Sequence, residues 1–210
     1  MGRDKLWLPL AGRITLAHTI DAFQASPLID TIVLVTSAER LEDARALCQE
    51  EQWHKVSAVV LGGSRRQDSV CIGLDTLAAE TGWVMIHDGA RPFVTPTIIE
   101  AGLQAAQQHL AAVAAVPVKD TIKQVQDGVI HATLDRSQLW AIQTPQVFSF
   151  PLIHEAHHSP IAQTDVTDDA SLVELLGQHV AVFPGSYTNI KITTQEDLIF
   201  AEALLQGHTA

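Results

Sequence analysis

The sequence predicts one α/β domain with a mostly parallel sheet and helices on both faces, and three observations lead there. The chain has 210 residues, about the size of a single domain. Hydrophobic residues make up 47% and charged residues 18%, which favours a large buried core. Short apolar runs alternate with helical patterns of roughly ten or more residues, as in consecutive βαβ units.

The first half of the chain shows this alternation most clearly. Apolar residues at helical spacing predict helices over 14–23, 39–52, 68–79 and 96–108. Apolar and β-branched runs predict strands over 31–35, 56–61, 83–86 and 111–116. Pro96 would stand in the first turn of its helix, where a missing N–H costs nothing.

The alternation breaks at Pro117, where we expect a β-hairpin. Asp127-Gly128 favours a primed two-residue turn between strands over 121–125 and 129–134. Further on, the pattern predicts an extended segment over 143–150, helices over 151–158, 168–176 and 194–205, and strands over 180–183 and 190–193. Thr194 can cap the last helix. The prediction is a single domain over 1–210 with a hairpin arm at about 118–150.

Charge and hydropathy exclude two classes of partner. Thirteen Lys and Arg against 24 Asp and Glu give a net charge of −11, which repels nucleic acid and anionic membranes. The apolar runs are far shorter than the ~20 residues that cross a bilayer, and no signal segment opens the chain. Cys48 and Cys71 are expected to be buried free thiols in a reducing compartment. These features predict a soluble, cytoplasmic protein.

The end of the strand over 56–61 carries a candidate binding loop. Ligands of open α/β sheets bind outside the carboxyl ends of the strands. Gly62-Gly63 lets the backbone approach a ligand closely, and the helix that follows offers free N–H groups to a nucleotide. An ordinary turn capped by Asp68 or Ser69 explains the same residues equally well.

The end of the strand over 83–86 carries the second candidate. Asp88 could accept hydroxyl groups or help to hold a cation, and Arg91 could bind a phosphate with its planar guanidinium. The alternative is a structural Asp88–Arg91 ion pair. Two further cations, Lys5 near the start and Lys191 in the predicted strand over 190–193, are weaker candidates.

A different chemistry is suggested by His154-Glu155-Ala156-His157-His158, which matches the H-E-x-x-H pattern of zinc proteases. The predicted helix is short and ends at Ser159-Pro160, which gives a metal little rigid support. A third ligand would have to come from Glu174 or His179. Zinc hydrolysis therefore remains an alternative.

Several short motifs lie in order along nearly the whole chain. They are Lys5 with Leu8-Pro9-Leu10, Gly62-Gly63 with Arg66 and Ser69-Val70, His87-Asp88-Gly89-Ala90-Arg91-Pro92, Lys119-Asp120-Thr121, Asp135-Arg136, Thr144-Pro145-Gln146, Thr167-Asp168-Asp169-Ala170-Ser171 and Asn189-Ile190-Lys191-Ile192-Thr193. As an ordered set they resemble the 2-C-methyl-D-erythritol 4-phosphate cytidylyltransferases of the non-mevalonate isoprenoid pathway.

The resemblance implies a Rossmann-like fold of the nucleotide-diphospho-sugar transferase type, and a homodimer whose exchanged hairpin arms reach into the partner's site. It implies that CTP and 2-C-methyl-D-erythritol 4-phosphate give 4-diphosphocytidyl-2-C-methyl-D-erythritol and pyrophosphate. Mg²⁺ would be bound mainly through the CTP phosphates, and no side chain is assigned as a metal ligand.

The resemblance also implies roles for individual residues. The catalytic residues would be Lys5, Arg136 and Lys191. The residues that bind the sugar-alcohol phosphate would be Asp88, Arg91, Thr121 and Thr144. The nucleotide-binding residues would be Gly62, Gly63, Ser69, Asp88 and Gly89.

The start of the chain departs from the family pattern. The family opens with an apolar strand and a glycine-rich loop that ends in Arg, of which Met1-Gly2 would be at most the tail, with Arg3 as a substitute cation. Either the sequence is incomplete, or this form lacks that strand and loop. A cytidylyltransferase for ribitol 5-phosphate and a truncated, non-catalytic nucleotide-binding homologue are the alternatives.

Overall fold

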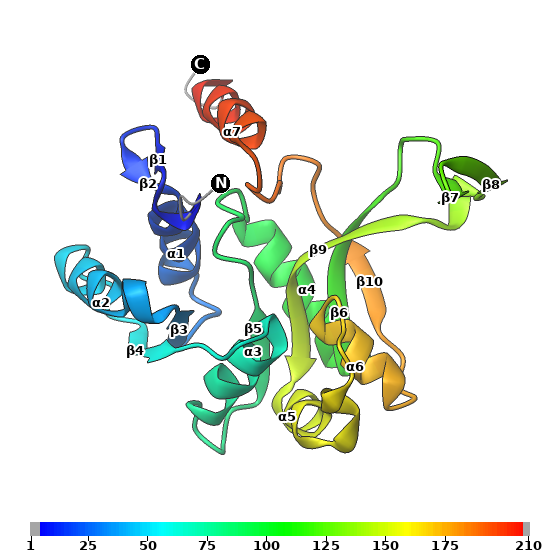
Figure 1. The fold of residues 1–210 in the computed structure, drawn as a ribbon. Coiled ribbons are helices and arrows are strands. Elements are labelled where there is room, and N and C mark those ends of the chain that lie inside the picture. Colours follow the sequence, from blue (N-terminus) through cyan, green and yellow to red (C-terminus); the bar gives the residue numbers. More distant parts are fainter. Residues whose placement is uncertain (1–4, 208–210) are drawn as a thin grey trace.

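The computed structural model describes residues 5–207, and its elements follow the predicted order (Figure 1). The helices are α1 (Thr15–Ala25), α2 (Leu41–Glu50), α3 (Arg66–Asp75), α4 (Pro96–His109), α5 (Phe150–His158), α6 (Asp169–Leu175) and α7 (Gln195–Gly207). The strands are β1 (Pro9–Leu10), β2 (Arg13–Ile14), β3 (Ile32–Thr36), β4 (Val56–Leu61), β5 (Trp83–Ile86), β6 (Ala111–Pro117), β7 (Lys123–Gln126), β8 (Val129–Thr133), β9 (Trp140–Ser149) and β10 (Ala181–Pro184).

The main sheet has four strands in the order β10-β6-β9-β5, and β3 pairs with β4 in a separate parallel sheet. Strands β10 and β6 are parallel, whereas β9 is antiparallel to both β6 and β5. Strands β5, β6 and β10 therefore share one direction, and β9, which returns from the arm, alone opposes them. In β9, Val147 pairs with Met85 on one side and with Ala112 on the other.

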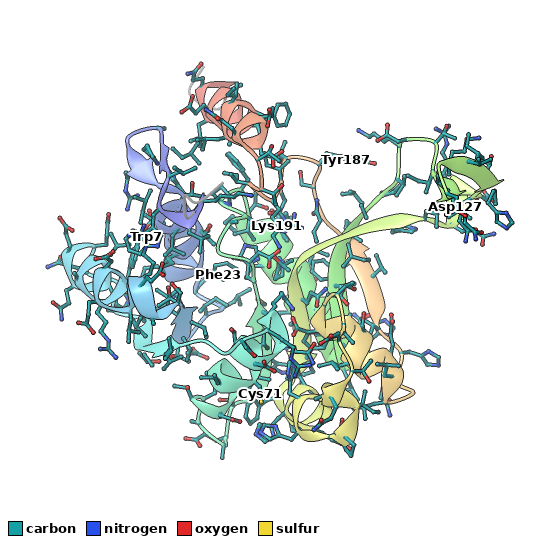
Figure 2. All side chains as sticks on the ribbon, viewed as in Figure 1. Trp7, Phe23, Cys71, Asp127, Tyr187 and Lys191 are labelled. Carbon is teal, nitrogen blue, oxygen red and sulfur yellow. The ribbon has the colours of Figure 1, made fainter. Side chains whose placement is uncertain are left out.

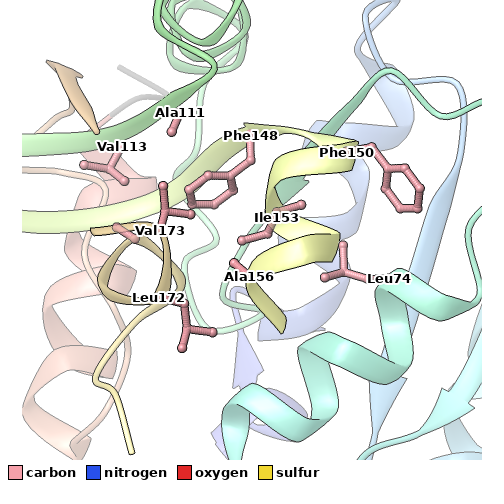
Figure 3. Packing of buried hydrophobic residues seen from close by; sticks show 10 residues of the cluster. Leu74, Ala111, Val113, Phe148, Phe150, Ile153, Ala156, Leu172 and Val173 are labelled. Carbon is pink, nitrogen blue, oxygen red and sulfur yellow. The ribbon is translucent and has the colours of Figure 1, made fainter. Parts of the chain in front are cut away.

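Both faces of the main sheet are covered by helices because β6 is apolar on both sides. Ala111 and Val113 pack with residues of α5 and α6, while Ala112 and Ala114 pack with residues of α1 and α4. Figure 3 shows the first of these clusters, in which Phe148 of β9 lies close to Ile153 and Val173. This packing confirms the predicted α/β class with helices on both faces.

The arm is a hairpin of β7 and β8 that extends away from the main sheet (Figure 1). Asp127 and Gly128 have φ of 51° and 78°, as the predicted primed turn requires. The hairpin exposes Val125, Val129 and Ile130, and the segments that join it to the main sheet expose Leu134, Trp140 and Ile142. The predicted boundary near 150 lies too far along the chain, because residues 143–148 of β9 are buried in the main sheet.

Other boundaries also needed correction. The predicted strand over 190–193 is an irregular segment, in which Ile192 donates one backbone hydrogen bond to Ala90. Its alternating apolar residues reflect core packing, since Ile192 is buried with Leu10 and Ala201. Helix α3 begins at Arg66 and ends at Asp75, earlier than predicted at both ends. The Thr194 cap is confirmed, because its Oγ1 accepts a hydrogen bond from the backbone N–H of Asp197 at 3.2 Å.

Cys48 and Cys71 are free thiols in α2 and α3, and each is half-buried rather than fully buried. Within residues 5–207, no helix combines the length and the apolar character needed to cross a bilayer.

Candidate active site

A pocket of about 300 Å³ opens beside the carboxyl end of β5, where β9 passes next to it. Four predicted site residues, Asp88, Arg91, Thr144 and Lys191, line this pocket. The other lining residues are Arg66, Ile142, Gln143, Gln146, Thr167 and Asp168. The structure thus brings together residues from the loop after β5, from β9 and from the segment before α7, at the end of the sheet where ligands of α/β folds bind.

Asp88 is the electrostatic centre of the pocket. Its carboxylate lies 3.1 Å from Lys191 Nζ, 3.3 Å from Arg91 Nε and 3.9 Å from Arg66 Nε. Burial acts to raise the pKa of Asp88, but the charges of Lys191, Arg66 and Arg91 outweigh it and lower this pKa below its ordinary value. The Asp88–Arg91 pair proposed as the structural alternative is present, but it is part of a larger cationic cluster.

His87 and Thr144 hold the start of this loop against β9. The His87 ring faces the Arg91 carbonyl through Nε2 (3.2 Å) and the Thr144 hydroxyl through Nδ1 (3.1 Å). Since a carbonyl oxygen only accepts, we assign the proton to Nε2, and the Thr144 hydroxyl then donates to Nδ1. The Thr144 oxygen in turn accepts from the backbone N–H of Asp88 at 3.0 Å. Burial lowers the pKa of His87 to about 4, so the ring is neutral near pH 7.

The segment that carries Lys191 is fixed by Asn189, which is fully buried. Its side-chain amide donates to the Thr144 carbonyl at 2.9 Å, and its own carbonyl accepts from Arg91 Nη1 at 2.8 Å. Lys191 follows two residues later, with a side chain that remains 43% exposed. Its ammonium can therefore turn from Asp88 towards a bound anion.

Arg66 is a site residue to which the sequence analysis gave no role. Its Nη2 lies 2.7 Å from Oδ2 of the fully buried Asp169, whose Oδ1 lies 3.2 Å from His157 Nε2. Burial acts to lower the pKa of Arg66, but Asp169 and Asp88 raise it above its ordinary value. Arg66 and Asp169 each belong to one of the motifs that carry the family resemblance, and this was the signal that could have pointed to them. Nothing in the sequence indicates that the two side chains pair.

Gly62 and Gly63 lie between β4 and α3, Ser69 lies in the first turn of α3, and none of the three lines the pocket. A Cβ on Gly62 would come within 2.6 Å of Ser69 Oγ, and one on Gly63 within 2.4 Å of Asp68 Cβ. Asp68 also accepts from the backbone N–H of Arg65 at 3.1 Å. The turn between β4 and α3 is therefore capped by Asp68, as the alternative interpretation predicted. The nucleotide-binding role of Gly62, Gly63 and Ser69 stays a prediction.

Gly89 follows Asp88 in the loop after β5, and Lys5 stands at the start of the described chain. A Cβ on Gly89 would lie 3.1 Å from Leu16 and 3.2 Å from Leu6, so the start of the described chain packs on this loop. Lys5 precedes Leu6 and is exposed, but it does not line the pocket. Met1, Gly2 and Arg3 lie outside the described residues.

Thr121 and Arg136, the remaining predicted site residues, are exposed on the arm. Figure 2 shows Lys191 near the middle of the molecule and Asp127 at the far end of the arm. Arg136 Nη1 donates to the Lys119 carbonyl at 2.7 Å, and neither Thr121 nor Arg136 lines the pocket. Within one chain, the structure does not bring them to Asp88.

The carboxylates around the pocket do not fit a magnesium site built by the protein. Asp88 faces three cations and Asp169 is paired with Arg66. Asp168 caps α6 by accepting from the backbone N–H of Ser171 at 3.1 Å, and it also accepts from Gln146 Nε2 at 2.7 Å. Mg²⁺ prefers oxygen ligands that are free to complete an octahedron, and these three carboxylates are already engaged by protein groups.

The H-E-x-x-H residues lie on α5, outside this pocket. Over residues 5–207, one group of three or more metal-binding side chains has its ligand atoms close together, namely Cys71, Asp75 and His158. Neither Glu174 nor His179 belongs to it, so the third ligand predicted for a zinc hydrolase is wrong.

A mixed sheet in which β5, β6 and β10 share one direction, with a cationic pocket at the strand ends, defines an α/β protein suited to anionic ligands. The family described as 2-C-methyl-D-erythritol 4-phosphate cytidylyltransferase matches the chain over residues 1–207. Relatives of that name from Syntrophotalea carbinolica and Dehalococcoides mccartyi are 51% and 48% identical, over 96% and 98% of this chain and 88% and 89% of their own.

Solved structures give the same result. The 4-diphosphocytidyl-2C-methyl-D-erythritol synthase of Anaerococcus prevotii aligns with a TM-score of 0.86 and 33% identity, over 94% of this chain and 88% of its own. The 2-C-methyl-D-erythritol 4-phosphate cytidylyltransferase of Thermus thermophilus aligns with a TM-score of 0.83 and 32% identity, over 96% and 94%. The chain belongs to the 2-C-methyl-D-erythritol 4-phosphate cytidylyltransferase family, and so to the nucleotidyltransferases.

Proposed function

We propose that this protein joins CTP and 2-C-methyl-D-erythritol 4-phosphate to give 4-diphosphocytidyl-2-C-methyl-D-erythritol and pyrophosphate, in the synthesis of isoprenoid precursors. The observation that carries the proposal is the gathering of Arg66, Arg91 and Lys191 around Asp88 at the strand ends. Such a cluster favours a phosphate-bearing substrate, and the family supplies its identity.

The reaction needs positioning and positive charge rather than a general base. A phosphomonoester has a second pKa near ~6, so its oxygen is already an ionised nucleophile at neutral pH. That oxygen attacks the α-phosphorus of CTP, a new P–O bond forms, and pyrophosphate leaves. In our proposal Lys191 and Arg136 orient the attacking phosphate, and Lys5 stabilises the negative charge that develops on the triphosphate.

Asp88, Arg91, Thr121 and Thr144 form the sugar-alcohol phosphate pocket in this proposal. Thr144 is well suited to it, because its hydroxyl is held between His87 and the Asp88 backbone. Gly62, Gly63 and Ser69 read the cytosine, and Asp88 and Gly89 lie by the ribose. The protein would receive Mg²⁺ on the phosphates of CTP, and the ion would supply positive charge there.

The working form in this proposal is a homodimer in which each arm enters the site of its partner. Two observations support it. The arm exposes a row of apolar side chains, which are unfavourable in water unless another surface covers them. Thr121 and Arg136, to which the resemblance gives roles in a substrate site, also do not line the pocket of their own chain. A cytoplasmic location agrees with the two unpaired cysteines.

The test is pyrophosphate release by the purified chain with Mg²⁺, CTP and 2-C-methyl-D-erythritol 4-phosphate, with ribitol 5-phosphate in parallel. We expect turnover with the methylerythritol phosphate and little with ribitol phosphate. Preference for ribitol phosphate would identify a different polyol phosphate as the substrate. CTP binding by calorimetry without turnover on either substrate would favour a non-catalytic nucleotide-binding protein.

A further inference from the structure

A cluster of four potential metal ligands lies where α3 and α5 pack together, outside the pocket described above. Cys71 and Asp75 are four residues apart on α3, and His154 and His158 are four residues apart on α5. This spacing places each pair on one face of its helix, and the two faces meet.

The ligand atoms lie close to the separations that a tetrahedral ion requires. His158 Nε2 is 3.1 Å from Asp75 Oδ1 and 3.9 Å from Cys71 Sγ. His154 Nε2 is 3.5 Å from the same Asp75 oxygen. Zinc bonds of about 2.0–2.3 Å at tetrahedral angles place ligand atoms roughly 3.3–3.7 Å apart. Small side-chain rotations would therefore bring three or four donors to one centre.

His158 is held in the tautomer that metal binding requires. Its Nδ1 lies 2.8 Å from the backbone carbonyl of His154, which can only accept a hydrogen bond. We therefore assign a proton to Nδ1, which leaves the lone pair of the neutral ring on Nε2, the atom that faces Asp75 and Cys71. A backbone carbonyl in this position is a common outer partner of zinc-bound histidines.

The four candidate ligands lie in a negatively charged part of the surface, on two helices that pack on the core, beside a cavity. Asp68 and Asp75 stand three residues before and four residues after Cys71 on α3, and their negative charge favours a bound cation. The buried Leu74 and Ile153 support the two helices directly beneath these side chains. A cavity of about 220 Å³ borders Cys71 and His158 and gives an ion access.

We propose that Cys71, Asp75 and His158, with His154 as the fourth candidate ligand, bind one Zn²⁺ ion and link α3 to α5. A thiolate, imidazoles and one carboxylate form a set that zinc prefers, whereas Mg²⁺ prefers oxygen ligands alone. The site is separate from the substrate pocket and involves no hydrolysis. Its first consequence is structural, because α3 also carries Arg66 at its amino end.

The direct test is zinc binding to the full chain, purified without a histidine tag and kept reduced. Calorimetry with Zn²⁺ in excess Mg²⁺ should give one zinc per chain, since Mg²⁺ occupies sites that need only oxygen. Co²⁺ in place of Zn²⁺ should give the sulfur-to-cobalt charge-transfer absorption of a thiolate ligand. Cys71→Ser and His158→Ala should each weaken zinc binding by at least ~100-fold, more than the loss of an outer partner costs.

Matched controls separate this site from adventitious binding. Cys48→Ser removes the other thiol and His109→Ala removes an exposed histidine on α4, and both should bind zinc as the wild type does. The cluster would be an Asp75–histidine ion pair only, and the proposal overturned, if the wild type binds no stoichiometric zinc. Equal affinities in Cys71→Ser and the wild type would overturn it as well. Circular dichroism of each variant shows whether it is folded.

Discussion

The pocket around Asp88 and the hairpin arm obtain their structure in different ways. At the pocket, His87, Thr144 and Asn189 are bonded to other segments of the same chain, so its geometry is fixed within the monomer. The arm consists of two strands that pair only with each other and leave apolar side chains exposed. Isolated two-stranded hairpins are marginally stable in water. The part of the pocket that one chain builds is therefore held by that chain alone, whereas the arm carries exposed apolar side chains for which we propose a partner surface.

The largest effect is expected from Lys191→Ala, which removes the most exposed cation at Asp88. If Lys191 orients the attacking phosphate, turnover should fall by roughly 100- to 1,000-fold, as for loss of one charge-stabilising donor. Steady-state pyrophosphate release measures this. Lys55→Ala, on a lysine that bonds the Ser26 carbonyl away from the pocket, is the control. A rate near wild type in folded Lys191→Ala protein would remove Lys191 from the mechanism.

The next effect concerns the stability of the pocket as the pH falls. Burial holds the pKa of His87 at about 4, below the 6.5 of an exposed histidine. Between these values the unfolded chain binds a proton that the folded chain does not. His87 therefore lowers the free energy of unfolding by up to about 3 kcal/mol as the pH falls from ~6.5 to ~4.

Urea unfolding across this pH range, on the wild type and on His87→Gln, isolates the contribution. Other groups titrate in both proteins, so the difference between the two curves is the informative quantity. We expect a steeper pH dependence in the wild type below pH ~6.5. Parallel curves would show that His87 is not held neutral by burial.

A smaller effect should separate the core from the arm by matched glycine substitutions. In Gly102→Ala the new Cβ would lie 2.9 Å from both Phe183 and Val147. Overpacking of this kind lowers the free energy of unfolding by ~1–3 kcal/mol. This loss outweighs the gain of ~1 kcal/mol that alanine brings to a helix in place of glycine. In Gly128→Ala no atom lies within 4 Å of the new Cβ. The positive φ alone costs ~1–2 kcal/mol, and this cost destabilises the hairpin only.

Thermal unfolding of the two glycine variants reads out the difference. Gly102→Ala should lower the main transition, because α4 packs on the sheet at this point. Gly128→Ala should leave that transition almost unchanged and affect only the arm. A larger loss of core stability in Gly128→Ala would mean that the arm is integral to the core of the monomer.

Much of the fold was predictable because its strands end at abrupt changes in the sequence. Strands β4 and β5 have the predicted bounds, since each is an apolar run closed by Gly62 or His87. The segment over 190–193 was mispredicted because alternating apolar residues also occur where an irregular segment packs on a core. The arm boundary was wrong because β9 runs from the exposed arm into the sheet without a break.

The candidate site was predictable only in part, for a related reason. Asp88 and Arg91 are neighbours in the sequence, so their shared position was visible from the residues themselves. Thr144 and Lys191 reach them through β9 and the Asn189 hydrogen bonds. The residues themselves made Lys191 only a weak candidate, and the family resemblance alone pointed to Thr144. The pairing of Arg66 with Asp169 depends on packing between distant segments and has no local signature.

The central claim is that one chain supplies the pocket and another supplies the arm, and a mixed dimer tests it most directly. Arg136→Ala and Lys191→Ala are each expected to be nearly inactive alone. After unfolding together and refolding, half of the dimers should be mixed, and each should hold one intact site. The account predicts recovery of about a quarter of the wild-type rate. No recovery in a sample shown to contain mixed dimers would contradict arm exchange.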